Sequence, residues 1–149
     1  MPNWCSNEVQ FDGSEEDITK FKEECFTDHK GVAVLDFSKV LPEPDYDKPK
    51  KDGTHNNGVQ TELHSVMPDW WNWRNENWGT KWNLVPTHDG DLTAYTVEDS
   101  ESFIQLEFDT AWSPPSGIYE ALVDKYPDLS ISWFYREDGV QMAGWLPYD

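Results

Sequence analysis

The residues best suited to chemistry lie between positions 68 and 82, where five of the chain's nine tryptophans are found. Arg74 stands among these indoles, where a guanidinium can stack on the rings or carry its charge through them to a carboxylate. Asn77, Thr80 and Lys81 add polar groups within the same stretch. This mixture suits either a packed aromatic cluster or a site that binds a flat or charged ligand.

A helix over residues 68–79 would position these side chains. At about 100° per residue, one face of this helix carries four indoles, those of Trp70, Trp71, Trp73 and Trp78. The other face carries the polar residues Asn72, Asn75 and Glu76. Pro68 suits the first turn and Gly79 suits the C-terminal stop. Two interpretations stay open: the aromatic face docks onto a sheet, or it forms a platform for a ligand or partner.

A second distinctive segment, residues 108–115, holds further polar and aromatic groups. If it meets the first, Lys81 or Arg74 could pair with Asp109 beside stacked indoles, as a buried structural ion pair or as a polar-ended aromatic pocket. The candidate site therefore comprises Trp70, Trp73, Arg74, Asn77, Trp78, Lys81, Trp82, Asp109 and Trp112.

No residue set specifies a reaction, so we expect no enzymatic activity, no cofactor and no metal. Nucleophile elbows and phosphate-binding glycine loops are absent from the sequence. The segment 88–91, His-Asp-Gly-Asp, is more typical of a plain turn than of a cation site. Cys5 and Cys25 fall on apolar faces of expected elements, which predicts buried thiols rather than a disulfide or a nucleophile. The histidines lack ligand spacing: His29, His55, His64 and His88.

The chain is strongly acidic, with 29 Asp and Glu against 11 Lys and Arg and a formal charge of -18. This charge disfavours direct binding to nucleic acid through phosphates. It suits attraction to a basic protein, of which nucleic-acid-binding proteins are the commonest kind, or simple solubility. The start of the chain lacks a signal-peptide pattern, and no apolar run approaches the roughly 18 residues of a membrane span. We therefore expect a soluble, cytoplasmic protein.

Hydrophobic patterns predict one α+β domain. Strands are expected at 3–11, 32–37, 92–97, 103–108, 129–135 and 140–145, and helices after Ser14 and after an N-cap at Ser113. Residues 42–58 predict a long mobile loop. The order is that of a ferredoxin-like β-α-β-β-α-β sandwich with helices on one face, an insertion at about 38–88 and one added C-terminal strand. The Trp-rich helix is expected to cover a sheet edge or the open face.

Four segments resemble YubB-type ferredoxin-like proteins of plasmids and phages: Met-Pro-Asn-Trp-Cys-Ser-Asn at 1–7, Glu-Asn-Trp-Gly-Thr-Lys-Trp at 76–82, Phe-Asp-Thr-Ala-Trp-Ser-Pro-Pro at 108–115 and Gly-Val-Gln-Met-Ala-Gly at 139–144. The resemblance implies a ferredoxin-like fold and an origin in a mobile element. It implies no activity and no catalytic residue.

Two functional classes follow. The first is an acidic interaction protein, such as an anti-CRISPR or anti-restriction inhibitor that occupies the basic nucleic-acid channel of a host enzyme. Its mark would be a face with Asp and Glu about 6–7 Å apart and binding that weakens in salt. The second is a small-ligand protein whose tryptophans stack a base or nucleotide. Its mark would be a concave indole pocket with salt-tolerant binding.

Overall fold

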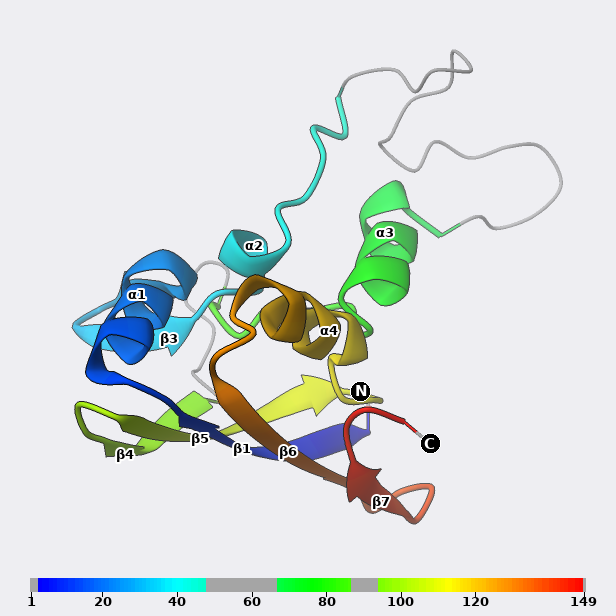
Figure 1. Ribbon diagram of the computed structural model, residues 1–149. Coiled ribbons are helices and arrows are strands. Elements are labelled where there is room, and N and C mark those ends of the chain that lie inside the picture. Colours follow the sequence, from blue (N-terminus) through cyan, green and yellow to red (C-terminus); the bar gives the residue numbers. More distant parts are fainter. Residues whose placement is uncertain (1–2, 48–66, 87–93, 149) are drawn as a thin grey trace, which may run out of the picture.

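A five-stranded antiparallel sheet forms one layer of the computed structural model, which describes residues 3–47, 67–86 and 94–148 (Figure 1). Its central strand is β1 (Trp4–Asp12), which pairs with β5 and β6 on either side. The full order is β4 (Ala94–Asp99), β5 (Phe103–Ala111), β1, β6 (Ser130–Glu137) and β7 (Met142–Trp145).

Helices α1 (Glu15–Cys25) and α4 (Ser116–Lys125) lie over one face of this sheet, as Figure 1 shows. With β1, β4, β5 and β6 they complete the β-α-β-β-α-β order, and β7 is the added strand. The ferredoxin-like sandwich predicted from the sequence is therefore confirmed. Local chemistry explains where α1 begins, because the Ser14 hydroxyl accepts a hydrogen bond from the Asp17 amide at 3.1 Å.

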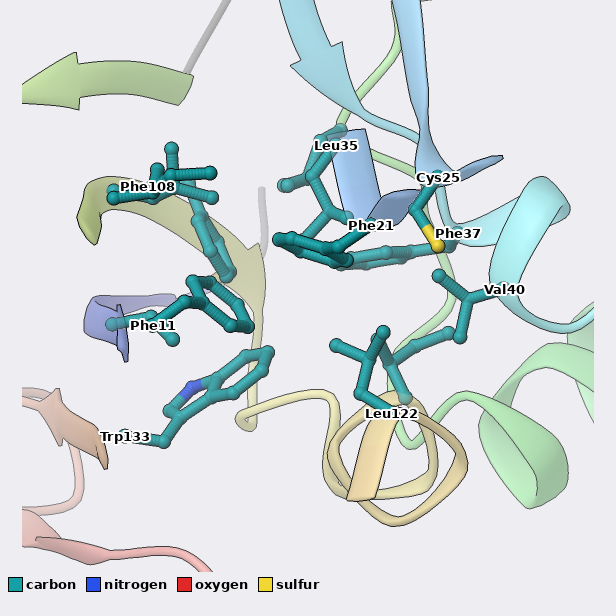
Figure 2. Close-up of a cluster of buried hydrophobic side chains, with 14 of the residues drawn as sticks. Phe11, Phe21, Cys25, Leu35, Phe37, Val40, Phe108, Leu122 and Trp133 are labelled. Carbon is teal, nitrogen blue, oxygen red and sulfur yellow. The ribbon is translucent and has the colours of Figure 1, made fainter. Parts of the chain in front are cut away.

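The hydrophobic core lies between the sheet and the helices. In Figure 2, Phe11, Phe108 and Trp133 project from the strands toward α1, α2 and α4. Alternation along β1 sets this arrangement, since every second residue of the strand from Cys5 to Phe11 is buried. The one polar residue of this buried set, Asn7, accepts the indole N–H of Trp133 at 2.9 Å. The predicted inward face of the first strand is thus confirmed, and so is the burial of both cysteines.

The segment between α1 and β4 differs from the sequence prediction. It begins with a two-stranded ribbon, β2 (Phe26–His29) and β3 (Val32–Leu35), followed by the short helix α2 (Phe37–Val40). The strand expected at 32–37 therefore ends earlier and pairs outside the main sheet. Asp36 explains the change, because its carboxylate accepts a hydrogen bond from the Ser38 amide at 3.0 Å and caps α2.

The Trp-rich helix, α3 (Asp69–Asn77), also lies elsewhere than predicted. It packs against α4 on the helical side of the fold and covers neither the open face nor an edge of the sheet (Figure 1). Gly79 does end the helix as expected, with φ at +90°. The other predicted helix starts later than expected, at Ser116 with Pro115 as N-cap, because the Ser113 hydroxyl donates to the Gly79 carbonyl at 2.7 Å instead of capping α4.

The predicted loop at 42–58 falls only partly within the described residues, since 48–58 lie outside them. The described start of the loop is anchored by side-chain contacts. Glu43 forms an ion pair with Arg74 and accepts a hydrogen bond from the Tyr46 hydroxyl at 2.8 Å. Burial and this hydrogen bond raise the pKa of Tyr46. His55, His64 and the turn at 88–91 also lie outside the described residues.

Candidate functional site

The two distinctive segments of the sequence meet, as the candidate site requires. The Thr80 hydroxyl donates to the Ala111 carbonyl at 3.0 Å, and the Gly117 amide donates to the Trp78 carbonyl at 3.1 Å. These bonds join the segment directly after α3 to the end of β5 and the start of α4. Residues 70–82 and 109–112 therefore lie in one region of the molecule.

Arg74 lies at the centre of this region and makes both kinds of contact predicted for it. Its guanidinium carbon lies 5.0 Å from the ring centroid of Trp70 and 5.1 Å from that of Trp78. The same guanidinium binds the Glu43 carboxylate through two nitrogens, with Nη2 to Oε2 at 3.2 Å. Arg74 therefore pairs with Glu43 rather than with Asp109, the partner that the sequence suggested for Arg74 or Lys81. Glu43 lies 31 residues away in a segment predicted to be a mobile loop, so no local pattern indicated this partner.

Three of the nine predicted site residues have structural roles. Trp78 is fully buried, and its indole N–H donates to the Leu41 carbonyl at 2.9 Å. Trp73 packs edge-on against Trp78 with ring centroids 5.8 Å apart. The Asn77 side chain donates to the Trp73 carbonyl at 2.8 Å within the helix. These side chains hold α3 in place rather than offering a surface to a ligand.

Four others line an open groove of about 700 Å³, namely Trp70, Arg74, Trp82 and Asp109. Trp4 closes one side of this groove and contacts Trp82, with ring centroids 6.0 Å apart. The Lys81 ammonium lies 4.5 Å from the Trp82 ring. Burial raises the pKa of Asp109. We call this the indole groove; Trp112, the last predicted residue, is exposed and does not line it.

Polar groups at the base of the indole groove bind one another. The Asn83 amide donates to Asp36 at 2.8 Å, and the Thr27 hydroxyl donates to the same carboxylate at 2.6 Å. The Asn83 oxygen in turn accepts the Phe37 amide at 2.9 Å. This network fixes α2 against the segment after α3, so these groups are already satisfied before any ligand binds.

The face of the sheet opposite the helices forms a second candidate surface. In the described chain the helices lie on one side only, so the outward residues of the five strands face solvent (Figure 1). Strand alternation gives this face five carboxylates and one guanidinium, from Glu8, Asp12, Glu98, Glu107, Asp109 and Arg136. We call it the acidic face. The sequence contained its signal, the charged residues at outward positions of the first strand and of the strand at 103–108, but the site prediction followed the tryptophans.

Both cysteines are buried thiols in the described chain. Burial raises the pKa of the Cys5 thiol to about 11, so it stays protonated at neutral pH. Burial likewise raises the pKa of Cys25. Among residues 3–47, 67–86 and 94–148, no group of three or more His, Cys, Asp or Glu could hold a metal ion. None of the helices in these ranges is long and apolar enough to cross a membrane.

Comparisons with known proteins agree with this fold. Residues 91–149 match a family described as "Ferredoxin-like domain in Api92-like protein". The chain is also 26% identical over 96 residues to a protein of Escherichia coli (strain K12) named "Uncharacterized protein YubB". The resemblance to the YubB-type ferredoxin-like family is confirmed. The aligned part covers 62% of this chain and 60% of the relative's length. No solved structure matches the chain.

The residues that match the family include more of the acidic face than of the indole groove. It contains β4 to β7 with α4, and thus Glu98, Glu107, Asp109 and Arg136 of the acidic face. The Trp-rich segment at 68–82 lies outside the matched residues. The family resemblance therefore includes much of the open sheet and leaves out most of the indole groove.

A substitution at Arg74 tests whether the ion pair between Arg74 and Glu43 stabilises the indole groove. Arg74→Met keeps much of the apolar stem and removes the guanidinium, so Glu43 is left half-buried without its partner. We expect a loss of about 1–3 kcal/mol in the free energy of unfolding, measured by urea denaturation. Arg74→Lys should recover only part of this loss, because an ammonium cannot bind the carboxylate through two nitrogens. Equal stability of all three proteins would contradict the assignment.

Proposed function

We propose that this protein is an interaction domain whose acidic face binds a positively charged surface of a partner protein. The observation that supports the proposal is the composition of this face, five carboxylates against one guanidinium on a sheet surface that no described helix covers. The one guanidinium, that of Arg136, is paired with Asp138 at 3.1 Å. Complementary charge raises association rates and selects partners of opposite sign.

The spacing of the carboxylates suits a partner that normally holds nucleic acid. Glu107 and Asp109 are two residues apart on β5 and share a face, which sets them about 7 Å apart. This matches the spacing expected for a protein that competes with phosphates. We therefore propose a basic, nucleic-acid-binding enzyme as partner, and an anti-defence role if the chain comes from a phage or plasmid. The surplus charge of -18 extends the attraction beyond the contact itself.

A pull-down with the tagged full chain tests this function. Bacterial lysate is applied at about 50 mM and about 500 mM salt, because screening weakens contacts between exposed charges. We expect a basic nucleic-acid-binding protein to be captured at low salt only, and to be released by added double-stranded DNA. Neutralising four carboxylates of the acidic face should reduce capture at least about fourfold, at roughly 0.2–1 kcal/mol per contact.

A matched variant controls for total charge. The face variant carries Glu8→Gln, Asp12→Asn, Glu98→Gln and Glu107→Gln. The control variant removes the same amount of charge on the helical side. It changes four exposed carboxylates to amides, those of Glu16, Glu23, Glu120 and Asp124. Equal loss in both variants would show that net charge alone attracts the partner. Capture that is indifferent to salt and to both variants would overturn the proposal.

The indole groove supports a second candidate function, binding of a neutral base or nucleoside. The favouring observation is that the groove is concave and partly indole-lined, with Trp4 and Trp82 exposed by 42% and 39%. Asp36, Glu43 and Asp109 also line it, and their charges oppose phosphate groups. Binding there would tolerate salt, so a captured ligand that survives 500 mM salt and is lost in Trp82→Ala would favour this alternative.

A further inference from the structure

A single row of side chains crosses the whole acidic face. The strand registers place Tyr95 opposite Glu107, Glu107 opposite Glu8, Glu8 opposite Phe134, and Phe134 opposite Trp145. The row therefore reads aromatic, carboxylate, carboxylate, aromatic, aromatic across strands β4, β5, β1, β6 and β7. The aromatic residues at the two ends of the row differ in their packing. Tyr95 is 63% exposed, whereas Phe134 packs on Trp145 with ring centroids 5.1 Å apart.

The middle of this row is hollow. A depression of about 160 Å³ is lined by Tyr95, Glu107, Glu8 and Phe134, with Ser6, Asp109 and Arg136 among its other residues. A volume of this size holds one planar side-chain head rather than a whole nucleotide. Because facing strands lie about 5 Å apart, both carboxylates of the row can reach the same occupant.

The two central glutamates lie directly opposite each other on neighbouring strands. Like charges directly opposite on neighbouring strands destabilise a sheet. Three ion pairs join described residues, namely Arg136 with Asp138, Lys22 with Asp99 and Arg74 with Glu43. None of them involves Glu8 or Glu107. A cation supplied by a partner would relieve this repulsion.

We propose that the hollow binds the guanidinium of an arginine side chain from the partner protein, an inference that rests on the proposed function. A guanidinium offers five N–H donors in one plane, so it can donate to both carboxylates at once. Its faces attract aromatic rings, and Tyr95 and Phe134 stand on either side of the glutamate pair. An ammonium is more strongly hydrated and lacks this planar fork, so lysine fits the row less well.

The test titrates the full chain with three short peptides of one length, containing four arginines, four lysines or four citrullines. Citrulline has the shape of arginine without its charge. Binding is followed by backbone amide NMR at about 50 mM salt. We expect the arginine peptide to bind at least about tenfold more tightly than the citrulline peptide and several-fold more tightly than the lysine peptide. The largest shifts should fall on the amides of Glu8 and Glu107.

Two variants with equal charge loss separate this inference from the proposed function. The row variant is Glu8→Gln with Glu107→Gln; the face control is Asp12→Asn with Glu98→Gln, on the same surface but outside the row. The row variant should lose about tenfold in affinity for the arginine peptide, and the face control less than about threefold. The thermal unfolding midpoint of the row variant should rise, because the repulsion between the two glutamates is removed. Weaker binding by this variant then cannot be ascribed to misfolding.

The outcomes have distinct meanings. Equal losses in the row variant and the face control, or equal affinities for arginine and lysine peptides, would overturn the guanidinium site while leaving an acidic interaction face in place. No binding of either cationic peptide, or equal binding of the citrulline peptide, would overturn both proposals.

Discussion

Gly117→Ala is expected to destabilise the fold strongly, by about 3 kcal/mol or more. A Cβ atom at this position would overlap the carbonyl oxygen of Asn77 and lie 2.7 Å from its carbonyl carbon. Both are backbone atoms, so no side chain can move aside to make room. Urea denaturation followed by far-UV circular dichroism measures the effect.

This cost arises because the end of α3 packs directly onto the start of α4. The Gly117 and Ile118 amides both donate to the Trp78 carbonyl, at 3.1 and 3.4 Å. A methyl group between the two backbones would stretch these bonds and pull the Trp-rich helix away from α4. The φ angle of Gly117 lies outside the left-handed region, so the cost of the substitution comes from the lack of space alone.

Gly31 offers a control of the opposite kind. Its φ is +87°, yet a Cβ atom there would meet nothing within 4 Å. Gly31→Asn should therefore cost little, since asparagine tolerates this conformation better than most residues. If Gly117→Ala proved as stable as the wild type, α3 and α4 would have to be further apart than they are in this structure.

The sheet and its flanking helices could be predicted because local patterns determine them. Two-residue alternation identified β1, β5 and β6, and an N-cap at Ser14 identified α1. The inward sides followed from the same alternation, and the register then fixed which outward residues lie opposite each other. These features depend on neighbours within a few residues, and that information is present in a single sequence.

Residues 26–47 could be predicted only in part, because distant contacts determine their structure. Asp36 ends β3 and caps α2 while binding Asn83, 47 residues away. Glu43 is fixed by Arg74, 31 residues away. Proline and acidic residues around position 43 are typical of loops, and nothing local shows that a guanidinium meets them.

The candidate site was only partly predictable for a related reason. Periodicity predicted that Trp70, Trp71, Trp73 and Trp78 share a helix, but not which tryptophans are buried. The structure divides them: Trp78 lies in the core, Trp73 packs on it, and Trp70 and Trp82 line the indole groove. The acidic face needed one more fact, namely which side of the sheet the helices leave open.

Trp78→Ala is the second substitution with a large expected effect, a loss of about 3–5 kcal/mol in the free energy of unfolding. The side chain is fully buried and packs edge-on against Phe37, with ring centroids 5.7 Å apart. Its removal leaves a cavity beneath α3 and also deprives the Leu41 carbonyl of its N–H donor. Denaturant unfolding monitored by circular dichroism measures the loss without relying on tryptophan fluorescence.

Two further variants help to interpret this loss. One separates the packing of the Trp78 ring from its hydrogen bond, and the other compares Trp78 with an exposed tryptophan. Trp78→Phe keeps most of the ring and loses the N–H, so it should cost about 1–2 kcal/mol. Trp82→Ala removes an exposed indole and should change the free energy of unfolding by less than about 1 kcal/mol. The reverse order, with Trp82→Ala unfolding the protein and Trp78→Ala leaving it intact, would mean that the tryptophan here assigned to the core is the one available to a ligand.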